Sequence, residues 1–213
     1  MIVATAGHVD HGKTSVVKHL SGVDTDSLEE ERRRGLTINL GYAYLHANTD
    51  TRVGLIDVPG HSRFINTMIA GVSGIDLALI VVAADEGPMP QTMEHLEVLR
   101  LLGIGQYAIV ITHIDRVERP RVVEVTEVLQ SVMGMQWPVF EVNNIDGSGV
   151  DDLKRYLLQM ALEQSAKSRE GYFRLSIDRS FLLNGIGLVA TGTAMSGSVS
   201  EGDKLFLLPG HRE

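Results

Sequence analysis

Cysteine is absent from the 213 residues, which excludes disulfides, zinc–thiolate sites and thiol nucleophiles. Long apolar runs are absent too, since none approaches the ~20 residues that span a bilayer. The short apolar stretch at residues 2–6 leads into a glycine-rich loop rather than a signal-peptide cleavage site. We therefore expect a cytoplasmic protein with no membrane partner.

Basic residues are scarce relative to acidic ones, with 19 Lys and Arg against 27 Asp and Glu and a formal net charge of −8. This balance argues against non-specific nucleic-acid binding by the chain as a whole, although it is compatible with a local basic patch. The apolar content of 44% and charged content of 22% are those of an ordinary globular protein. The length suffices for one full domain and part of a second.

Strand-like apolar runs alternate with helical patterns over residues 1 to about 163. This alternation is typical of an α/β fold, with a mostly parallel sheet and helices on both faces. We expect strands at residues 2–6, 41–47, 52–58, 76–84, 107–112 and 139–143. We expect helices at residues 13–20, 61–70, 91–102, 120–133 and 150–163.

The pattern changes after a polar stretch at residues 163–171, which we interpret as a linker. Beyond it, short apolar runs separated by glycine-containing turns predict antiparallel strands. Some 40 residues are too few to close a β-barrel. We therefore expect a nucleotide-binding domain at residues 1–165 and a truncated barrel at residues 172–213, whose missing strands were cut away or come from elsewhere.

The most informative segment is Gly7–Thr14, which reads GHVDHGKT between a predicted strand and a predicted helix. In this context glycines let several backbone N–H groups face one phosphate group at a helix N-terminus. Lys13 is expected to reach the β- and γ-phosphates, and the Thr14 hydroxyl to bind Mg²⁺. The alternative is an ordinary glycine turn before a helix. The residues expected to bind nucleotide here are Asp10, His11, Gly12, Lys13, Thr14 and Ser15.

Two further segments are placed to sense a γ-phosphate. Asp57 ends a predicted strand and is expected to hold Mg²⁺, while the Gly60 amide contacts phosphate. His61 is positioned to orient the attacking water, and Thr37 to supply a second hydroxyl to Mg²⁺. A plain Pro-Gly turn followed by a surface histidine is the alternative.

Base recognition is expected at the end of the strand at residues 107–112, where the chain reads Thr112-His113-Ile114-Asp115. A carboxylate here can accept both the N1 and N2 hydrogens of guanine, which adenine lacks. Asp115 therefore predicts GTP and GDP as ligands and makes an ATPase the weaker hypothesis. An incidental acid at a strand end is the other alternative. The basic run Arg32–Arg34 follows three glutamates and is read as a solvated helix face or an RNA contact.

Together these motifs resemble the translational GTPases of the elongation factor Tu type. Residues 7–14, 34–38 (RGLTI) and 57–61 (DVPGH) carry that resemblance. Residues 36–44, 173–179 and 187–193 resemble, more narrowly, the selenocysteine-specific elongation factors. The resemblance implies a P-loop GTPase that delivers selenocysteinyl-tRNA to the ribosome, with slow intrinsic and ribosome-stimulated hydrolysis. A nucleotide-gated binding module without useful hydrolysis is the alternative.

The resemblance also implies roles for individual residues. Val9 and Leu36 would form an apolar gate beside His61, and Asp178 and Arg179 would line an aminoacyl pocket. An edge-strand ion pair explains the last two equally well. A monomer is expected. In that family a distal domain binds the messenger hairpin, and these 213 residues do not include it, so this chain is not expected to bind the hairpin by itself.

Two departures from the family pattern concern the base. His113 replaces a lysine whose stem stacks on guanine, and an imidazole can also stack, so binding is expected to persist. Asn143-Asn144 replaces the usual Ser-Ala, which puts the backbone contact to the guanine oxygen in question.

Overall fold

The computed structural model describes residues 1–26, 33, 37–46, 52–72, 74–163 and 171–208. The chain divides into two compact units, Met1–Gln164 and Ser165–Glu213. Residues 34–36, which include the predicted gate residue Leu36, lie outside the described residues, as do Arg32 and most of the predicted linker.

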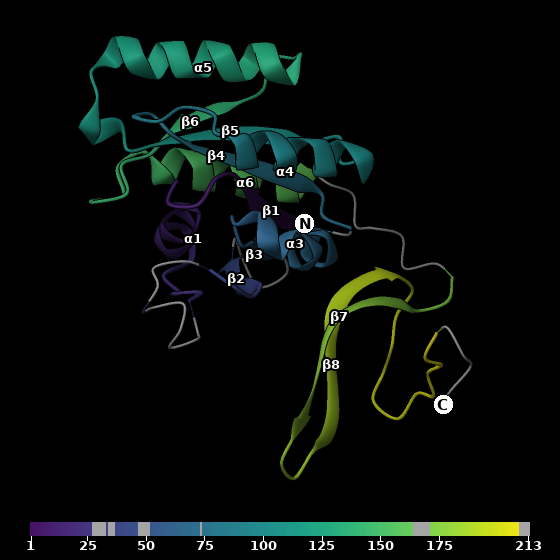
Figure 1. The fold of residues 1–213 in the computed structure, drawn as a ribbon. Coiled ribbons are helices and arrows are strands. Elements are labelled where there is room, and N and C mark those ends of the chain that lie inside the picture. Colours follow the sequence, from purple (N-terminus) through teal and green to yellow (C-terminus); the bar gives the residue numbers. More distant parts are fainter. Residues whose placement is uncertain (27–32, 34–36, 47–51, 73, 164–170, 209–213) are drawn as a thin grey trace. The chain divides into compact units, whose positions relative to one another are not determined.

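A six-stranded sheet in the order β2-β3-β1-β4-β5-β6 forms the centre of the first unit (Figure 1). All neighbouring pairs are parallel except β2 and β3, which are antiparallel. The carboxyl ends of the parallel strands therefore meet at one edge, where ligands of such sheets bind. The strands are β1 (Ile2–Ala6), β2 (Gly41–His46), β3 (Arg52–Asp57), β4 (Leu77–Ala83), β5 (Tyr107–Thr112) and β6 (Val139–Glu141).

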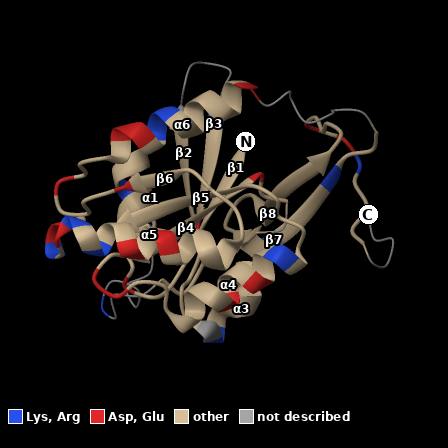
Figure 2. Ribbon diagram, turned by 90° about the horizontal axis from the view of Figure 1, so that it is seen from above, with Lys and Arg blue, Asp and Glu red and all other residues tan. Residues whose placement is uncertain are grey.

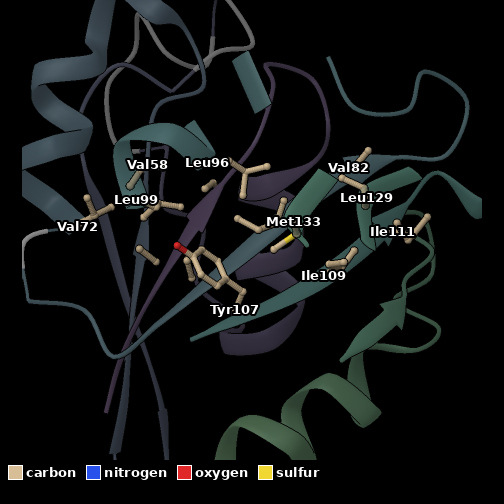
Figure 3. Packing of buried hydrophobic residues seen from close by; sticks show 14 of the residues in the cluster. Val58, Val72, Val82, Leu96, Leu99, Tyr107, Ile109, Ile111, Leu129 and Met133 are labelled. Carbon is tan, nitrogen blue, oxygen red and sulfur yellow. The ribbon is translucent and has the colours of Figure 1, made fainter. Parts of the chain in front are cut away.

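Helices cover both faces of this sheet because the central strands are apolar on both sides. One buried cluster joins α1 and α6 to the sheet, and a second joins α3, α4 and α5 to the opposite face. In β4, Val82 belongs to the second cluster and its neighbour Val81 to the first, as expected for side chains that alternate across a strand. Figure 3 shows Leu96 and Leu99 of α4, Leu129 of α5 and Ile109 and Ile111 of β5 among the members of this second cluster. The helices are α1 (Lys13–Ser21), α3 (Ile65–Val72), α4 (Pro90–Leu101), α5 (Arg119–Met133) and α6 (Val150–Glu163).

Most charged residues of the first unit lie on helices and loops, and the strands β1, β4 and β5 carry none (Figure 2). Burying these three strands therefore removes apolar surface from water without a desolvated charge. Among the described helices, none is both long and apolar enough to cross a bilayer.

The prediction of a mixed α/β fold with a mostly parallel sheet is confirmed. The largest difference concerns the predicted helix at residues 61–70. Residues Ser62–Phe64 form a 3₁₀ turn first, in which Phe64 N–H donates to His61 O at 2.8 Å, and α3 then continues to Val72. A tight turn of this kind is common where a helix begins.

The second unit contains an antiparallel hairpin of β7 (Arg174–Leu183) and β8 (Gly187–Ser196). Gly185 and Gly187 have φ of 83° and 109°, and Ile186 N–H donates to Leu183 O at 3.0 Å across the turn. The pairing is irregular between Ile177 and Arg179, a β-bulge that contains residue 178. A complete barrel is not formed by the described residues.

Candidate functional site

The loop from β1 to α1 is held against the sheet by contacts that require its glycines. Gly7 has φ of 143°, and a β-carbon there would lie 2.2 Å from Val81 O. Its N–H donates to His95 Nδ1 at 3.1 Å. Gly12 (φ 82°) is the N-cap residue of α1, and Asp10 adopts φ of 61°, which is uncommon for a residue with a side chain. Such a backbone at a helix N-terminus favours an anion.

Lys13 lies beneath this loop and is almost fully buried. Its Nζ donates to Gly7 O at 3.1 Å and to His8 O at 2.6 Å, so the side chain is curled under the loop. Burial lowers the pKa of Lys13 to about 8, although the carboxylates of Asp57 and Asp10 oppose this shift. A phosphate at the loop would restore the charge of this ammonium, because an anion stabilises the protonated form.

Six oxygen-bearing side chains lie close together near Lys13. They are the hydroxyls of Thr5, Thr14, Thr25 and Thr37 and the carboxylates of Asp26 and Asp57. The fully buried Asp57 accepts from Thr5 Oγ1 at 3.0 Å and from Thr25 Oγ1 at 2.8 Å. Burial raises the pKa of Asp57, and the hydroxyl hydrogen bonds and Lys13 oppose this effect. A cation bound near Asp57 would therefore stabilise the charged carboxylate, which burial disfavours.

Three members of this group, Thr14, Thr37 and Asp26, are connected to one another through their side chains. Thr14 Oγ1 and Thr37 Oγ1 are 3.0 Å apart, and Thr37 Oγ1 donates to Asp26 Oδ1 at 3.1 Å. Neighbouring oxygens of an octahedral magnesium site are also about 3 Å apart, given Mg–O distances near 2.1 Å. Among the described residues no three His, Asp or Glu side chains could hold a metal by themselves. The oxygen donors therefore fit Mg²⁺ that is also bound by phosphate.

These residues surround a hollow with a volume of about 350 Å³. Its size and its lining of amides, hydroxyls, one lysine and carboxylates suit the phosphates of a nucleotide rather than an apolar ligand. It is lined by Val9, Asp10, Gly12, Lys13, Thr14, Ser15, Asp26, Thr37, Gly60, Glu86, His113 and Arg116.

Gly60 and His61 differ in their relation to the hollow. A β-carbon on Gly60 would lie 2.5 Å from Lys13 Nζ and 2.9 Å from Val9 N, so only glycine permits this approach. His61 is not among the residues lining the hollow. Its Nδ1 accepts from Arg63 N–H at 3.2 Å, and its ring meets Phe64 edge-on with centroids 6.1 Å apart. The His61 imidazole therefore lies next to the hollow, but it contacts Arg63 and Phe64 of the following turn instead of facing the hollow.

Two residues predicted to bind nucleotide, Thr112 at the end of β5 and His11 in the loop, bond to each other and do not line the hollow. Thr112 Oγ1 donates to His11 O at 2.8 Å, and both residues are fully buried. His113 lines the hollow with φ of 53°. Asp115 is the middle residue of the following 3₁₀ turn (Ile114–Arg116), and its side chain is exposed.

Asp85, in the loop after β4, fixes the side chains that face this end of the hollow. One carboxylate oxygen lies 3.1 Å from His113 Nδ1, and the other accepts from Arg116 Nη1 at 3.0 Å. Partial burial would raise the pKa of Asp85, but its hydrogen bonds with Arg116 and His113 outweigh that effect and lower it. These contacts therefore fix the orientation of the His113 imidazole at this end of the hollow.

The two asparagines after β6 have different environments. Asn143 Oδ1 accepts from Ile145 N–H at 2.9 Å in a local turn. Asn144 O accepts from His19 Nε2 at 2.9 Å, and its side chain packs against Gly12. Only Asn144 is therefore attached to the phosphate-binding loop.

The remaining predicted residues lie in the second unit. Arg179 is exposed in β7 opposite Thr191, and only the backbone of residue 178 is described. The aminoacyl pocket predicted at Asp178 and Arg179 stays a prediction.

Sequence reasoning missed several residues of the site. Thr5, Thr25 and Asp26 contact the predicted magnesium ligands, His95 binds the loop, and Asp85 orients His113. A threonine inside a strand looks like any β-branched residue, so Thr5 carried no signal. The spacing of Asp26 to Thr37 carried none either, because only folding brings them together.

Two buried histidines near the loop make the fold sensitive to acid. Burial, aided by Lys13, lowers the pKa of His95 to about 3. Burial also lowers the pKa of His11 to about 4, with Glu86 Oε2 3.4 Å from its Nε2 opposing the shift. Both imidazoles are neutral in the folded state at pH 5, whereas they are protonated in the unfolded chain.

We expect the free energy of unfolding to fall by about 3 kcal/mol between pH 6.5 and pH 5 because of these two residues. The stability is present above pH 6.5 and is lost as the pH falls toward 4, since the unfolded chain then binds more protons. Urea unfolding at several pH values measures this slope. His95→Gln, which keeps an acceptor for Gly7 N–H, should remove about half of it. His19→Gln on the exposed face of α1 should leave the slope unchanged; an equal reduction in both variants would contradict the assignment.

Comparison with known proteins was consistent with this geometry. The family model described as elongation factor Tu GTP binding domain matches residues 1–171. Two selenocysteine-specific elongation factors are similar in sequence. The one from Escherichia coli is 49% identical over 97% of this chain, and the one from Desulfomicrobium baculatum is 44% identical over 100% of it. The match covers 34% of each of these relatives, so the chain spans about a third of their length.

Solved structures give the same result. A bacterial selenocysteine-specific elongation factor superimposes with a TM-score of 0.88 and 38% identity, covering 98% of this chain and 37% of that one. The elongation factor SelB from Methanococcus maripaludis, in complex with the GTP analogue GppNHp, gives a TM-score of 0.82 and 31% identity, covering 98% and 44%.

Proposed function

Because this chain belongs to the elongation factor Tu family of GTP-binding domains, we propose that it is the guanine-nucleotide switch of a selenocysteine-specific elongation factor. It binds GTP or GDP with Mg²⁺ and hydrolyses GTP when the factor delivers selenocysteinyl-tRNA to the ribosome. The observation that carries the proposal is the hollow in which Lys13, Thr14 and Thr37 converge on the loop at Gly7–Gly12. The high identity to two such factors supports the choice of aminoacyl-tRNA.

The roles of the residues follow from their places in the hollow. Loop amides and Lys13 bind the phosphates, and Thr14, Thr37 and Asp57 hold Mg²⁺ directly or through water. Bound Mg²⁺ neutralises charge on the phosphate oxygens. Thr37 and Gly60 belong to separate segments that both reach the phosphate loop, so loss of the γ-phosphate would release both.

The base is expected to lie between the end of β5 and the loop after β6, which are adjacent in the sheet. Asp115 would accept the N1 and N2 hydrogens of guanine, and the His113 ring would stack on it. The hydrogen bond with Asp85 supports this role by fixing the ring.

The test of the proposal is a competition experiment. Fluorescently labelled GDP is bound to the purified protein at millimolar Mg²⁺ and then displaced with unlabelled GDP, GTP or ADP. Displacement by both guanosine phosphates and none by ADP at equal concentration is expected. Equal displacement by ADP would refute guanine specificity, and no binding of labelled GDP to folded protein would refute the proposal.

We propose that His61 acts in GTP hydrolysis. Its imidazole is beside Gly60 but turned toward Arg63 and Phe64, which supports slow hydrolysis by the isolated protein. Reorientation on the ribosome would bring it to the attacking water. The same geometry favours a second candidate function, a nucleotide-gated binding module without useful hydrolysis.

Single-turnover hydrolysis with and without ribosomes distinguishes the two. We expect ribosomes to stimulate the rate, and His61→Ala to lower the stimulated rate by roughly 10²–10³-fold with unchanged GDP affinity, because a positioning group acts on the transition state. The control Arg63→Ala, which removes an exposed side chain two residues away, should keep the stimulation. Absence of any stimulation in the unchanged protein would favour the binding module.

The second unit is proposed to begin a β-barrel that contacts the aminoacyl end of tRNA. Large apolar side chains of the hairpin are exposed, among them Leu182 at 79% and Leu188 at 74%. Such surface is expected to be covered by further strands. Asp178 and Arg179, at the bulge, would line the aminoacyl pocket. A monomer in the cytoplasm is the corresponding state, because both ribosome and tRNA are there.

A further inference from the structure

Thr25, in the loop after α1, is buried and does not line the hollow, although the next residue, Asp26, does. Its Oγ1 donates to Asp57 Oδ2 at 2.8 Å, across 32 residues of sequence. Threonine hydroxyls in loops usually bond to nearby backbone groups or to water. A buried loop hydroxyl that donates to the carboxylate proposed to hold Mg²⁺ points instead to a role in positioning that carboxylate.

Two hydroxyls hold the two oxygens of Asp57 separately. Thr5 Oγ1 donates to Oδ1 at 3.0 Å, whereas Thr25 Oγ1 donates to Oδ2. Thr5 is itself fixed, because its Oγ1 accepts from Val58 N–H at 3.2 Å. The carboxylate cannot turn about its Cβ–Cγ bond without losing one of these hydrogen bonds, and its remaining lone pairs can still accept from a water bound to a metal ion. The plane of the carboxylate is therefore set by Thr5 and Thr25.

Thr25 is held in turn by its packing against the start of β2. A β-carbon on Gly41 would lie 2.5 Å from Thr25 Cβ and 3.2 Å from its Oγ1, so the threonine side chain lies directly on the backbone of this glycine. The adjacent Asp26 accepts from Thr37 Oγ1 at 3.1 Å. Residues 25 and 26 therefore connect Asp57 with Thr37, two of the side chains proposed to hold Mg²⁺.

We propose that Thr25 is a positioning residue for Mg²⁺, whose hydroxyl orients the Asp57 carboxylate and thereby raises the affinity of the nucleotide complex for the ion. This inference rests on the proposed function, because it requires Mg²⁺ that is bound by the phosphates and by Asp57. Residues that hydrogen-bond a metal-binding side chain typically change metal affinity by roughly 10- to 100-fold. Since Thr25 does not line the hollow, its effect should be on the ion and not on the nucleotide alone.

The experiment measures the affinity for fluorescently labelled GDP in EDTA and over a series of Mg²⁺ concentrations. The unchanged protein should bind GDP more tightly as Mg²⁺ rises. Thr25→Val keeps the shape of the side chain but removes the hydroxyl, so it should need roughly 10-fold more Mg²⁺ to reach half of this gain, with unchanged GDP affinity in EDTA. Thr25→Ser keeps the hydroxyl and should keep the Mg²⁺ midpoint of the unchanged protein.

The matched control is Thr126→Val, which removes a hydroxyl that donates to Val122 O at 2.8 Å within α5 and should leave the Mg²⁺ midpoint unchanged. Thr25→Ala guards against loss of the fold, because it leaves space for water and should shift the midpoint in the same direction as Thr25→Val. Thermal unfolding without nucleotide checks each variant.

A folded Thr25→Val or Thr25→Ala protein that keeps the Mg²⁺ midpoint would overturn the inference. So would a loss of GDP affinity that is equal in EDTA and in Mg²⁺, because Thr25 would then serve the fold alone. Failure of the unchanged protein to bind GDP at all would overturn the proposed function as well, whereas GDP binding that does not respond to Mg²⁺ would overturn only the role of the ion and of Thr25.

Discussion

Replacing Lys13 with methionine is expected to lower the affinity for GDP by roughly 10²–10⁴-fold, which corresponds to two lost charge-assisted hydrogen bonds of about 1.5–3 kcal/mol each. The ammonium is buried under the loop and is already bonded to Gly7 O and His8 O. Its position lets the phosphates approach a charge that water does not screen. Titration calorimetry with GDP measures the loss.

The same variant should leave the nucleotide-free protein almost as stable as before. At pH 7 the folded state holds a buried ammonium whose pKa is lowered to about 8, so its removal relieves a desolvation cost. Loss of the two hydrogen bonds to the loop carbonyls acts in the opposite direction with similar size. A fall of more than about 10 °C in the melting temperature would show that Lys13 mainly maintains the fold.

Proton linkage provides a more specific check. Part of the Lys13 population is neutral at pH 8.5 without ligand, because the pKa is about 8. Bound phosphate raises this pKa, so GDP binding should take up protons at pH 8.5. Calorimetry in two buffers with different ionisation enthalpies measures the uptake. It should be smaller in Lys13→Met, and equal uptake in both proteins would place the titrating group elsewhere.

The Asp115→Asn substitution is expected to weaken GDP binding by roughly 10²–10⁴-fold, because the carboxylate's two charge-assisted hydrogen bonds to the base are lost. The asparagine amide can instead donate to the O2 atom of xanthine and accept from its N1–H. Xanthosine diphosphate should therefore become the better ligand. The Asp115 side chain is exposed, so the fold should be unaffected.

Competition between GDP and xanthosine diphosphate measures this change of preference. Glu118→Gln removes an exposed carboxylate three residues later in the chain and should preserve guanine preference. Unchanged GDP affinity in Asp115→Asn would show that the base is recognised by other residues.

The local order of the chain was largely predictable. The strand at Ile2–Ala6, the glycine loop and the helix from Lys13 are contiguous, so their geometry depends on neighbours in the sequence. Gly103 and Pro120 also correctly marked the end of one helix and the start of another. The one predicted helix that changed, at residues 61–70, begins as a 3₁₀ turn, because Phe64 N–H bonds to His61 O.

By itself the sequence determined the fold class, and it predicted the phosphate loop and the guanine-recognition residues, since glycine geometry, apolar periodicity and base chemistry act over a few residues. Only the tertiary structure decided that Asp85 would fix His113 and that Thr25 would bond Asp57. It also decided that the Asn144 side chain would pack against Gly12. These residues are far apart in the chain and meet because parallel strands bring their carboxyl ends to one edge of the sheet, where the contacts depend on packing that no local pattern encodes.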